Sequence, residues 1–149
     1  VRNVKRVVEA VQHRYPYVHR LAIGDLSDRN GGHLAPHRSH QSGRDVDIGF
    51  YFKRRPAGYP ESFVVGTARN LDLAANFYMF ERFCDAGSVQ EIFLVTELQK
   101  LFYDWGKRHG ASRATLDHMF QYPSPPGSAH GCIHHEHGHD DHIHVRFKR

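Results

Sequence analysis

The sequence predicts an α+β fold, with residues 1–149 forming a single domain. Segments whose apolar residues repeat at helical spacing mix with short segments typical of strands, without the regular strand–helix alternation of a parallel sheet. The length of 149 residues suits one domain with a sizeable core, and an apolar content of 40% fits a soluble globular chain.

The first elements are a helix, a short strand and a loop. Four valines at spacing i, i+3, i+4 and i+7 indicate an amphipathic helix that ends near Tyr15-Pro16. These are Val4, Val7, Val8 and Val11. Leu21-Ala22-Ile23 is predicted to be a strand, and residues 25–36 a loop because Asn30-Gly31-Gly32 is typical of a turn.

The middle of the chain predicts two longer helices separated by a strand. An apolar stripe between Ala68 and Cys84 indicates the first helix, which Gly87 ends. Ile92-Phe93-Leu94-Val95 is predicted to be a buried strand. Thr96-Glu97-Leu98-Gln99 has the form of a capping box, in which Thr96 caps a second helix that ends at Gly110.

Beyond these helices the chain is predicted to end in loops and one strand. Ser112 is expected to cap a short helix that runs to Phe120, and residues 122–132 read as a long loop rich in Pro, Gly and Ser. From His142 the side chains alternate, so His142, His144 and Arg146 share one face of a strand. Its other face is apolar and suits a core.

The charge and the histidine content limit the function. A net charge of +4 with a pI near 9.2 fits an acidic partner such as a cell-wall polymer or nucleic acid, and equally fits no such partner. Neither Cys-x2-Cys nor a basic recognition helix is present, so no nucleic-acid partner is predicted. No apolar run approaches the length of a membrane span, and the oligomeric state stays open.

Two segments together predict a metal site. The segment before residue 48 holds His40 and, seven residues on, Asp47, and the final strand supplies His144. Two imidazoles and one carboxylate, with a fourth position open for water, form a catalytic zinc set.

Further polar residues surround this proposed zinc set. His142 is placed to act as the base. His139 and His37 are candidates for second-sphere donors or oxyanion stabilisers. Asp45 shares the Asp47 face and is a candidate for orienting a histidine, and Arg146 suits either a salt bridge or a substrate carboxylate.

These residues resemble a known family. The sets His37-x2-His40-x6-Asp47 and His139-x2-His142-x-His144 are similar to the paired motifs of the LAS metallopeptidases, and within that group to the penicillin-insensitive murein endopeptidases. The resemblance implies a small antiparallel sheet of about four strands flanked by helices. It implies zinc held by His40, Asp47 and His144, and catalysis by His142.

The resemblance also implies a substrate and a location. The substrate is expected to be the D-alanyl–diamino acid cross-link of peptidoglycan, and the protein is expected to be periplasmic or secreted. An extracytoplasmic location favours a disulfide between Cys84 and Cys132, the alternative being two reduced, buried thiols.

The sequence is also compatible with two other functions. One is a D,D-carboxypeptidase or dipeptidase of the same group, for which Glu136, eight residues before His144, is poorly spaced to be the base. The other is a non-enzymatic histidine-rich zinc-binding module, suggested by seven histidines within residues 130–144.

Overall fold

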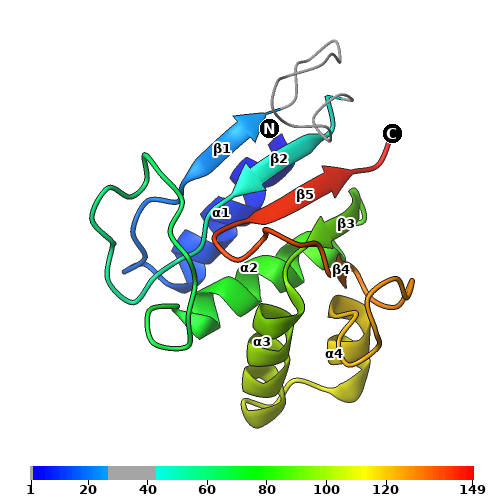
Figure 1. The fold of residues 1–149 in the computed structure, drawn as a ribbon. Coiled ribbons are helices and arrows are strands. Elements are labelled where there is room, and N and C mark those ends of the chain that lie inside the picture. Colours follow the sequence, from blue (N-terminus) through cyan, green and yellow to red (C-terminus); the bar gives the residue numbers. More distant parts are fainter. Residues whose placement is uncertain (1, 27–42) are drawn as a thin grey trace.

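The α+β class is confirmed. The computed structural model describes residues 2–26 and 43–149, which form four helices and a five-stranded mixed sheet (Figure 1). The helices are α1 (Arg2–Arg14), α2 (Leu73–Asp85), α3 (Thr96–Arg108) and α4 (Arg113–Met119). The strands are β1 (Ile23–Leu26), β2 (Asp45–Ile48), β3 (Val89–Phe93), β4 (Ile133–His134) and β5 (Ile143–Phe147).

The sheet has the order β1-β2-β5-β3-β4, with β5 in its centre. Neighbouring strands are antiparallel except β3 and β4, which run parallel, so the sheet is mixed and has one strand more than expected. The last strand of the chain is thus inserted between β2 and β3, which come earlier in the sequence. This insertion places the segment around Asp47 and the segment around His144 on neighbouring strands.

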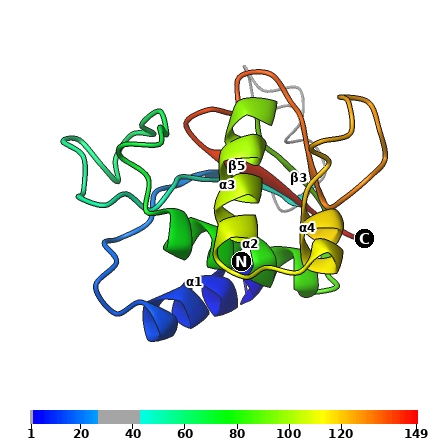
Figure 2. The ribbon, with the colours of Figure 1, turned by 90° about the horizontal axis from the view of Figure 1, so that it is seen from below.

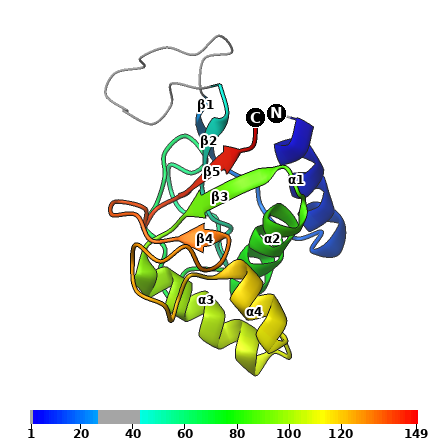
Figure 3. The same cartoon turned by 90° about the vertical axis from the view of Figure 1, so that its right-hand side faces the viewer.

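Helices cover the sheet on one face and along one edge. Figure 3 shows α1 and α2 against one face, with α3 and α4 beyond β4. In Figure 2, α2 lies beside both α1 and α3. The valine stripe of α1 faces inward as predicted, since Val4, Val7 and Val11 are buried. A hydrophobic core fills the space between these layers, and Phe80, Phe102 and Ile143 are among its fully buried side chains.

Helix capping agrees with the sequence at one position and differs at another. Ser112 caps α4 as predicted, because its hydroxyl accepts a hydrogen bond from the backbone N–H of Thr115 at 3.0 Å. The capping box at Thr96 is not formed. Val95 is the N-cap of α3, Thr96 is already helical, and the Thr96 hydroxyl instead lies 3.0 Å from Nδ1 of His135.

The predicted disulfide is also absent from this structure. Cys84 and Cys132 are free thiols, although they are close enough for a hydrogen bond between their side chains. Burial, followed by the contact with Cys132, raises the pKa of the Cys84 thiol well above its ordinary value. Within the described part of the chain, no helix is long and apolar enough to span a membrane.

Candidate active site

The final strand presents its two faces as its alternation predicts. Ile143 and Val145 are fully buried in the core, and His144 is turned to the opposite face. In the antiparallel register His144 lies directly across from Asp47 on β2 and from Phe93 on β3. Because β5 is central, His144 is covered by both neighbours and is only 2% exposed.

Each nitrogen of the His144 ring faces a carboxylate. Nδ1 lies 3.0 Å from Oδ1 of Asp47, and Nε2 lies 2.9 Å from Oδ1 of Asp45. Burial lowers the pKa of His144, but the hydrogen bonds and charges of Asp47 and Asp45 outweigh it and leave the pKa raised. The two carboxylates thus favour protonation of this ring, with Nε2–H donating to Asp45.

His142 lies beside this pair and is oriented by its neighbour in sequence. Its Nδ1 lies 2.5 Å from Oδ1 of Asp141, and its Nε2 lies 3.8 Å from Oδ1 of Asp47. Because a carboxylate only accepts, the neutral ring carries its proton on Nδ1 and a lone pair on Nε2. Phe63 stacks on the ring, with centroids 4.8 Å apart, which fixes the plane of the imidazole.

His139 completes the cluster. Its ring centroid lies 4.7 Å from that of His142 and 6.0 Å from that of His144. Burial, and then the neighbouring His142, lower its pKa, so the neutral form is favoured. Its Nδ1 donates to the carbonyl oxygen of His137 at 3.2 Å, which leaves the lone pair on Nε2.

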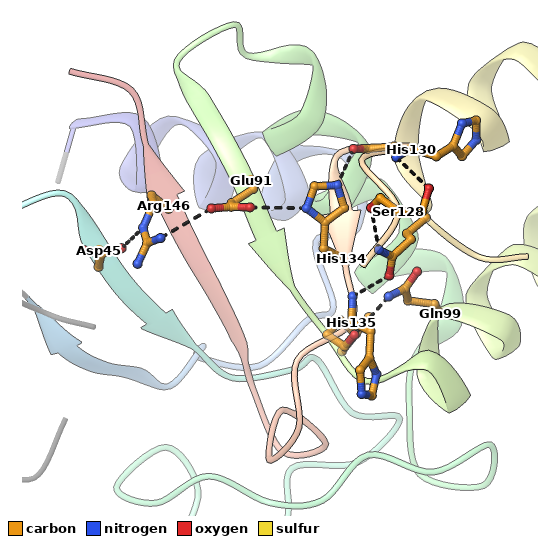
Figure 4. A network of polar contacts seen from close by, with 11 residues as sticks. Asp45, Glu91, Gln99, Ser128, His130, His134, His135 and Arg146 are labelled. Carbon is orange, nitrogen blue, oxygen red and sulfur yellow. Dashed lines mark hydrogen bonds and ion pairs between the residues drawn. The ribbon is translucent and has the colours of Figure 1, made fainter. Parts of the chain in front are cut away.

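Arg146 takes part in a chain of ion pairs that crosses the sheet. Its Nε donates to Oδ1 of Asp45 at 2.8 Å, and an Nη lies 3.4 Å from Oε1 of Glu91. Oε2 of Glu91 in turn lies 3.2 Å from Nδ1 of His134 (Figure 4). Of the two roles open to Arg146, this geometry is that of a salt bridge. The same oxygen of Asp45 contacts both Arg146 and His144, so Arg146 helps to hold Asp45 in position.

The described residues include two of the three predicted zinc ligands. His40 and His37 lie outside the described residues, and among residues 2–26 and 43–149 no group of three His, Cys, Asp or Glu side chains is arranged to hold a metal ion. The two described ligands fit zinc. Two donors on one tetrahedral zinc lie about 3.4 Å apart, close to the 3.0 Å between Nδ1 of His144 and Oδ1 of Asp47. A carboxylate on the second nitrogen of a ligating histidine is usual in zinc sites, and Asp45 supplies it.

Three side chains at this site were not predicted from the sequence. Asp141 precedes His142 and so belongs to the opposite face of an ideal strand, but the structure begins β5 only at Ile143, so the pair lies in the preceding turn. Phe63 and Glu91 reach the site from distant parts of the chain, and no motif marks them. Phe63 carries no signal in the sequence, and Glu91 only precedes the strand that was predicted to begin at Ile92.

The site is not the most spacious hollow in the molecule. A cavity of about 710 Å³ lies where β3 begins and β5 ends. Val89, His118, Cys132 and Lys148 are among the residues that line it. It lies apart from the histidine cluster, and we take the cluster as the functional site because its orienting contacts are chemically specific.

A comparison with known protein families gives a match over the first part of the chain. The family model that matches residues 1–65 describes a class of peptidases. The family in question is the penicillin-insensitive murein endopeptidases, so the resemblance predicted from the motifs is confirmed. The matched range contains the first motif, around Asp47, and ends before the second, around His144, which the structure brings beside it. A search of curated proteins gave no match.

Proposed function

We propose that this chain is a single-domain, zinc-dependent endopeptidase that hydrolyses D-alanyl–diamino acid cross-links in peptidoglycan. The observation that carries the proposal is the convergence of Asp47, His139, His142 and His144, with a carboxylate orienting each of the last two rings. The match of residues 1–65 to murein endopeptidases supports the choice of substrate. Since peptidoglycan lies outside the cytoplasmic membrane, we place the protein in the periplasm or among secreted proteins.

The zinc ligands in this proposal are His40, Asp47 and His144. Zinc bound there supplies a Lewis acid that polarises the scissile carbonyl and lowers the pKa of water. His144 would hold the zinc through Nδ1, while its Nε2–H donates to Asp45. Arg146 keeps Asp45 in place through the ion pair at 2.8 Å.

The proton transfers fall to His142. Its Nδ1 proton is held by Asp141, so Nε2 takes the proton of the attacking water and later donates it to the leaving amine. Phe63 and Asp141 together fix the ring, so that Nε2 keeps facing Asp47 during both transfers.

For His139 we propose a role that differs from the two expected from the sequence, a donor beside the zinc ligands or an oxyanion stabiliser. In its neutral form Nδ1 donates to His137, so Nε2 accepts a hydrogen bond and does not stabilise an oxyanion. We therefore assign His139 to orienting the attacking water or the leaving amine. For His37 we propose, from the motif alone, a hydrogen bond that supports one of the zinc ligands.

The test is digestion of purified cross-linked muropeptides, followed by mass analysis of the products. We expect the zinc-loaded protein to convert dimers to monomers, and His142→Ala to retain zinc but release no monomers. Loss of a single D-alanine without separation of the dimer would instead identify a D,D-carboxypeptidase. A zinc-loaded wild-type protein that releases nothing contradicts the proposal.

A further inference from the structure

A groove runs along the wall of the site next to His139. It has a volume of about 450 Å³, and Gly138 and Asp140, the two neighbours of His139, both line it. Its walls are tied to the site on both sides, because the carbonyl of His139 accepts from Val95 N–H at 3.1 Å and that of Asp140 accepts from Gly66 N–H at 2.9 Å. A ligand in this groove therefore lies beside the proposed catalytic histidines.

The groove contains a half-buried histidine, His135, that has no role in the proposed chemistry. The backbone N–H of Thr96 donates to its Nδ1 at 3.0 Å. Because a backbone N–H only donates, Nδ1 carries the lone pair and the neutral ring carries its proton on Nε2. The N–H of the ring is thus on the side turned away from Thr96.

Two buried glutamines hold the backbone around this histidine. Gln121, 2% exposed, accepts from the backbone N–H of His135 at 2.8 Å and donates to the carbonyl of Ser128 at 2.7 Å. Gln99, fully buried, accepts from Tyr122 N–H at 3.0 Å and donates to the carbonyl of Leu94 at 3.0 Å. Buried amides with both ends bonded make a rigid support, so the ring of His135 is held in one orientation before any ligand binds.

The rest of the groove lining indicates the chemistry of the ligand. Val65, which is 49% exposed, and Leu98 provide apolar surface. Glu97 and Asp140 add carboxylates, which disfavour an anionic ligand. A neutral amide next to an aliphatic side chain, as found in a peptide, satisfies both the Nε2–H donor and this surface.

We propose that this groove is a substrate subsite in which Nε2–H of His135 donates to a backbone carbonyl oxygen of the stem peptide, next to the scissile bond. Val65 and Leu98 pack against the aliphatic part of the same residue. The identity of this peptide rests on the proposed function. His135 is thus a binding and positioning residue, with no part in proton transfer.

The test compares two substitutions of His135 in the inactive His142→Ala background. In His135→Asn the side-chain oxygen accepts from Thr96 N–H as Nδ1 does. The shorter amide has no donor at the position of Nε2–H, so that hydrogen bond to the ligand is lost. In His135→Ala both contacts are lost. Binding of an intact cross-linked muropeptide dimer is measured by calorimetry. His130→Asn, on the exposed loop before β4, is the matched control, and thermal unfolding checks folding.

We expect both His135 variants to bind the dimer roughly 3- to 10-fold more weakly, the range for one lost hydrogen bond. We expect the control to bind as the parent does. In the otherwise active protein, KM is expected to rise by a similar factor, with a smaller change in kcat. Wild-type affinity in His135→Asn, with or without weakening in His135→Ala, overturns the inference, because His135 then only supports α3.

The two proposals fail in different ways. If the active protein cleaves no muropeptide yet His135→Asn weakens dimer binding, the endopeptidase claim falls and the subsite stands. If cleavage occurs and His135→Asn has no effect on affinity, the endopeptidase claim stands and the subsite falls.

Discussion

At the scale of single residues, carboxylates orient the imidazole rings of the site. Asp45 holds Nε2 of His144 at 2.9 Å, and Asp141 holds Nδ1 of His142 at 2.5 Å. In each case the carboxylate decides which nitrogen carries the proton and which can face a metal ion or a substrate.

We predict that Asp45→Asn weakens zinc binding by about 10- to 100-fold, the usual range when a group that supports a metal ligand is changed. The amide lacks the negative charge that favours the proton on Nε2 of His144, and it no longer balances the charge of Arg146. Competition with a chromophoric chelator measures the affinity, with Asp117→Asn on α4 as control. An unchanged zinc affinity shows that Asp45 does not act through His144.

A second prediction concerns Asp141→Asn. Without a charged acceptor at Nδ1, the proton-transferring form of His142 is less favoured, and we expect kcat to fall by about 10²- to 10⁴-fold. Zinc affinity is expected to stay at the wild-type level, because within the described part of the chain Asp141 contacts His142 and neither Asp47 nor His144. Steady-state kinetics on muropeptide dimers gives the first value, and chelator competition the second. A parallel loss of zinc would assign Asp141 to the metal site instead.

Much of the site could be predicted from the sequence at the level of single residues, for a physical reason. Alternation in a strand places His144 and Asp47 on defined faces before the partner strand is known. The contact between Thr96 and His135 shows where such reasoning stops, because a local capping pattern was outcompeted by a histidine 39 residues away. The pairing of Asp141 with His142 was equally hidden, since it depends on the turn before β5.

At the scale of elements, the helices follow their apolar spacing, whereas the strands do not reveal their partners. The valine stripe of α1 and the cap at Ser112 were predictable because they are local. The two-residue strand β4 and its parallel pairing with β3 were not, because so short a segment has no pattern of its own. The strand order was equally hidden, since the central strand comes last in the chain.

The contact between α2 and α3 yields a prediction at this scale. Glycine inside a helix ordinarily costs about 1 kcal/mol relative to alanine. At Gly106 of α3, however, an added Cβ would lie 2.5 Å from the ring of the buried Phe77 on α2. We therefore expect Gly106→Ala to lower the free energy of unfolding by about 1–3 kcal/mol.

Urea unfolding measures this effect, with the exposed Lys107→Ala as control. The loss is expected to shrink when Phe77→Leu is added, because the smaller side chain makes room for the methyl group. A gain in stability for Gly106→Ala in the wild-type background would mean that helix propensity outweighs the clash.

At the scale of the whole molecule, the sheet joins two motifs that lie about a hundred residues apart. Asp45 contacts His144 across 99 residues of sequence, and Arg146 contacts Asp45 across 101. Because zinc is proposed to bridge β2 and β5, it acts as a link between the two ends of the chain. Binding to the folded state alone stabilises it in proportion to the logarithm of metal concentration.

Metal removal is therefore expected to lower the unfolding temperature. With free zinc at a hundred times its dissociation constant, the stabilisation is about 2.7 kcal/mol. Calorimetry of the zinc-loaded and chelator-treated protein measures the shift, and His144→Ala is expected to show none. An equal shift in His144→Ala would place the stabilising metal elsewhere.

The central claim, that Asp47 and His144 hold one catalytic zinc, is tested most directly by counting tightly bound zinc ions. Metal-free wild type, His144→Ala and the surface control His130→Ala are titrated with zinc in the presence of a competing chelator. We predict one tight ion in the wild type and the control, and none in His144→Ala. Several weakly bound ions in all three proteins would contradict the account and identify a histidine-rich zinc-binding module.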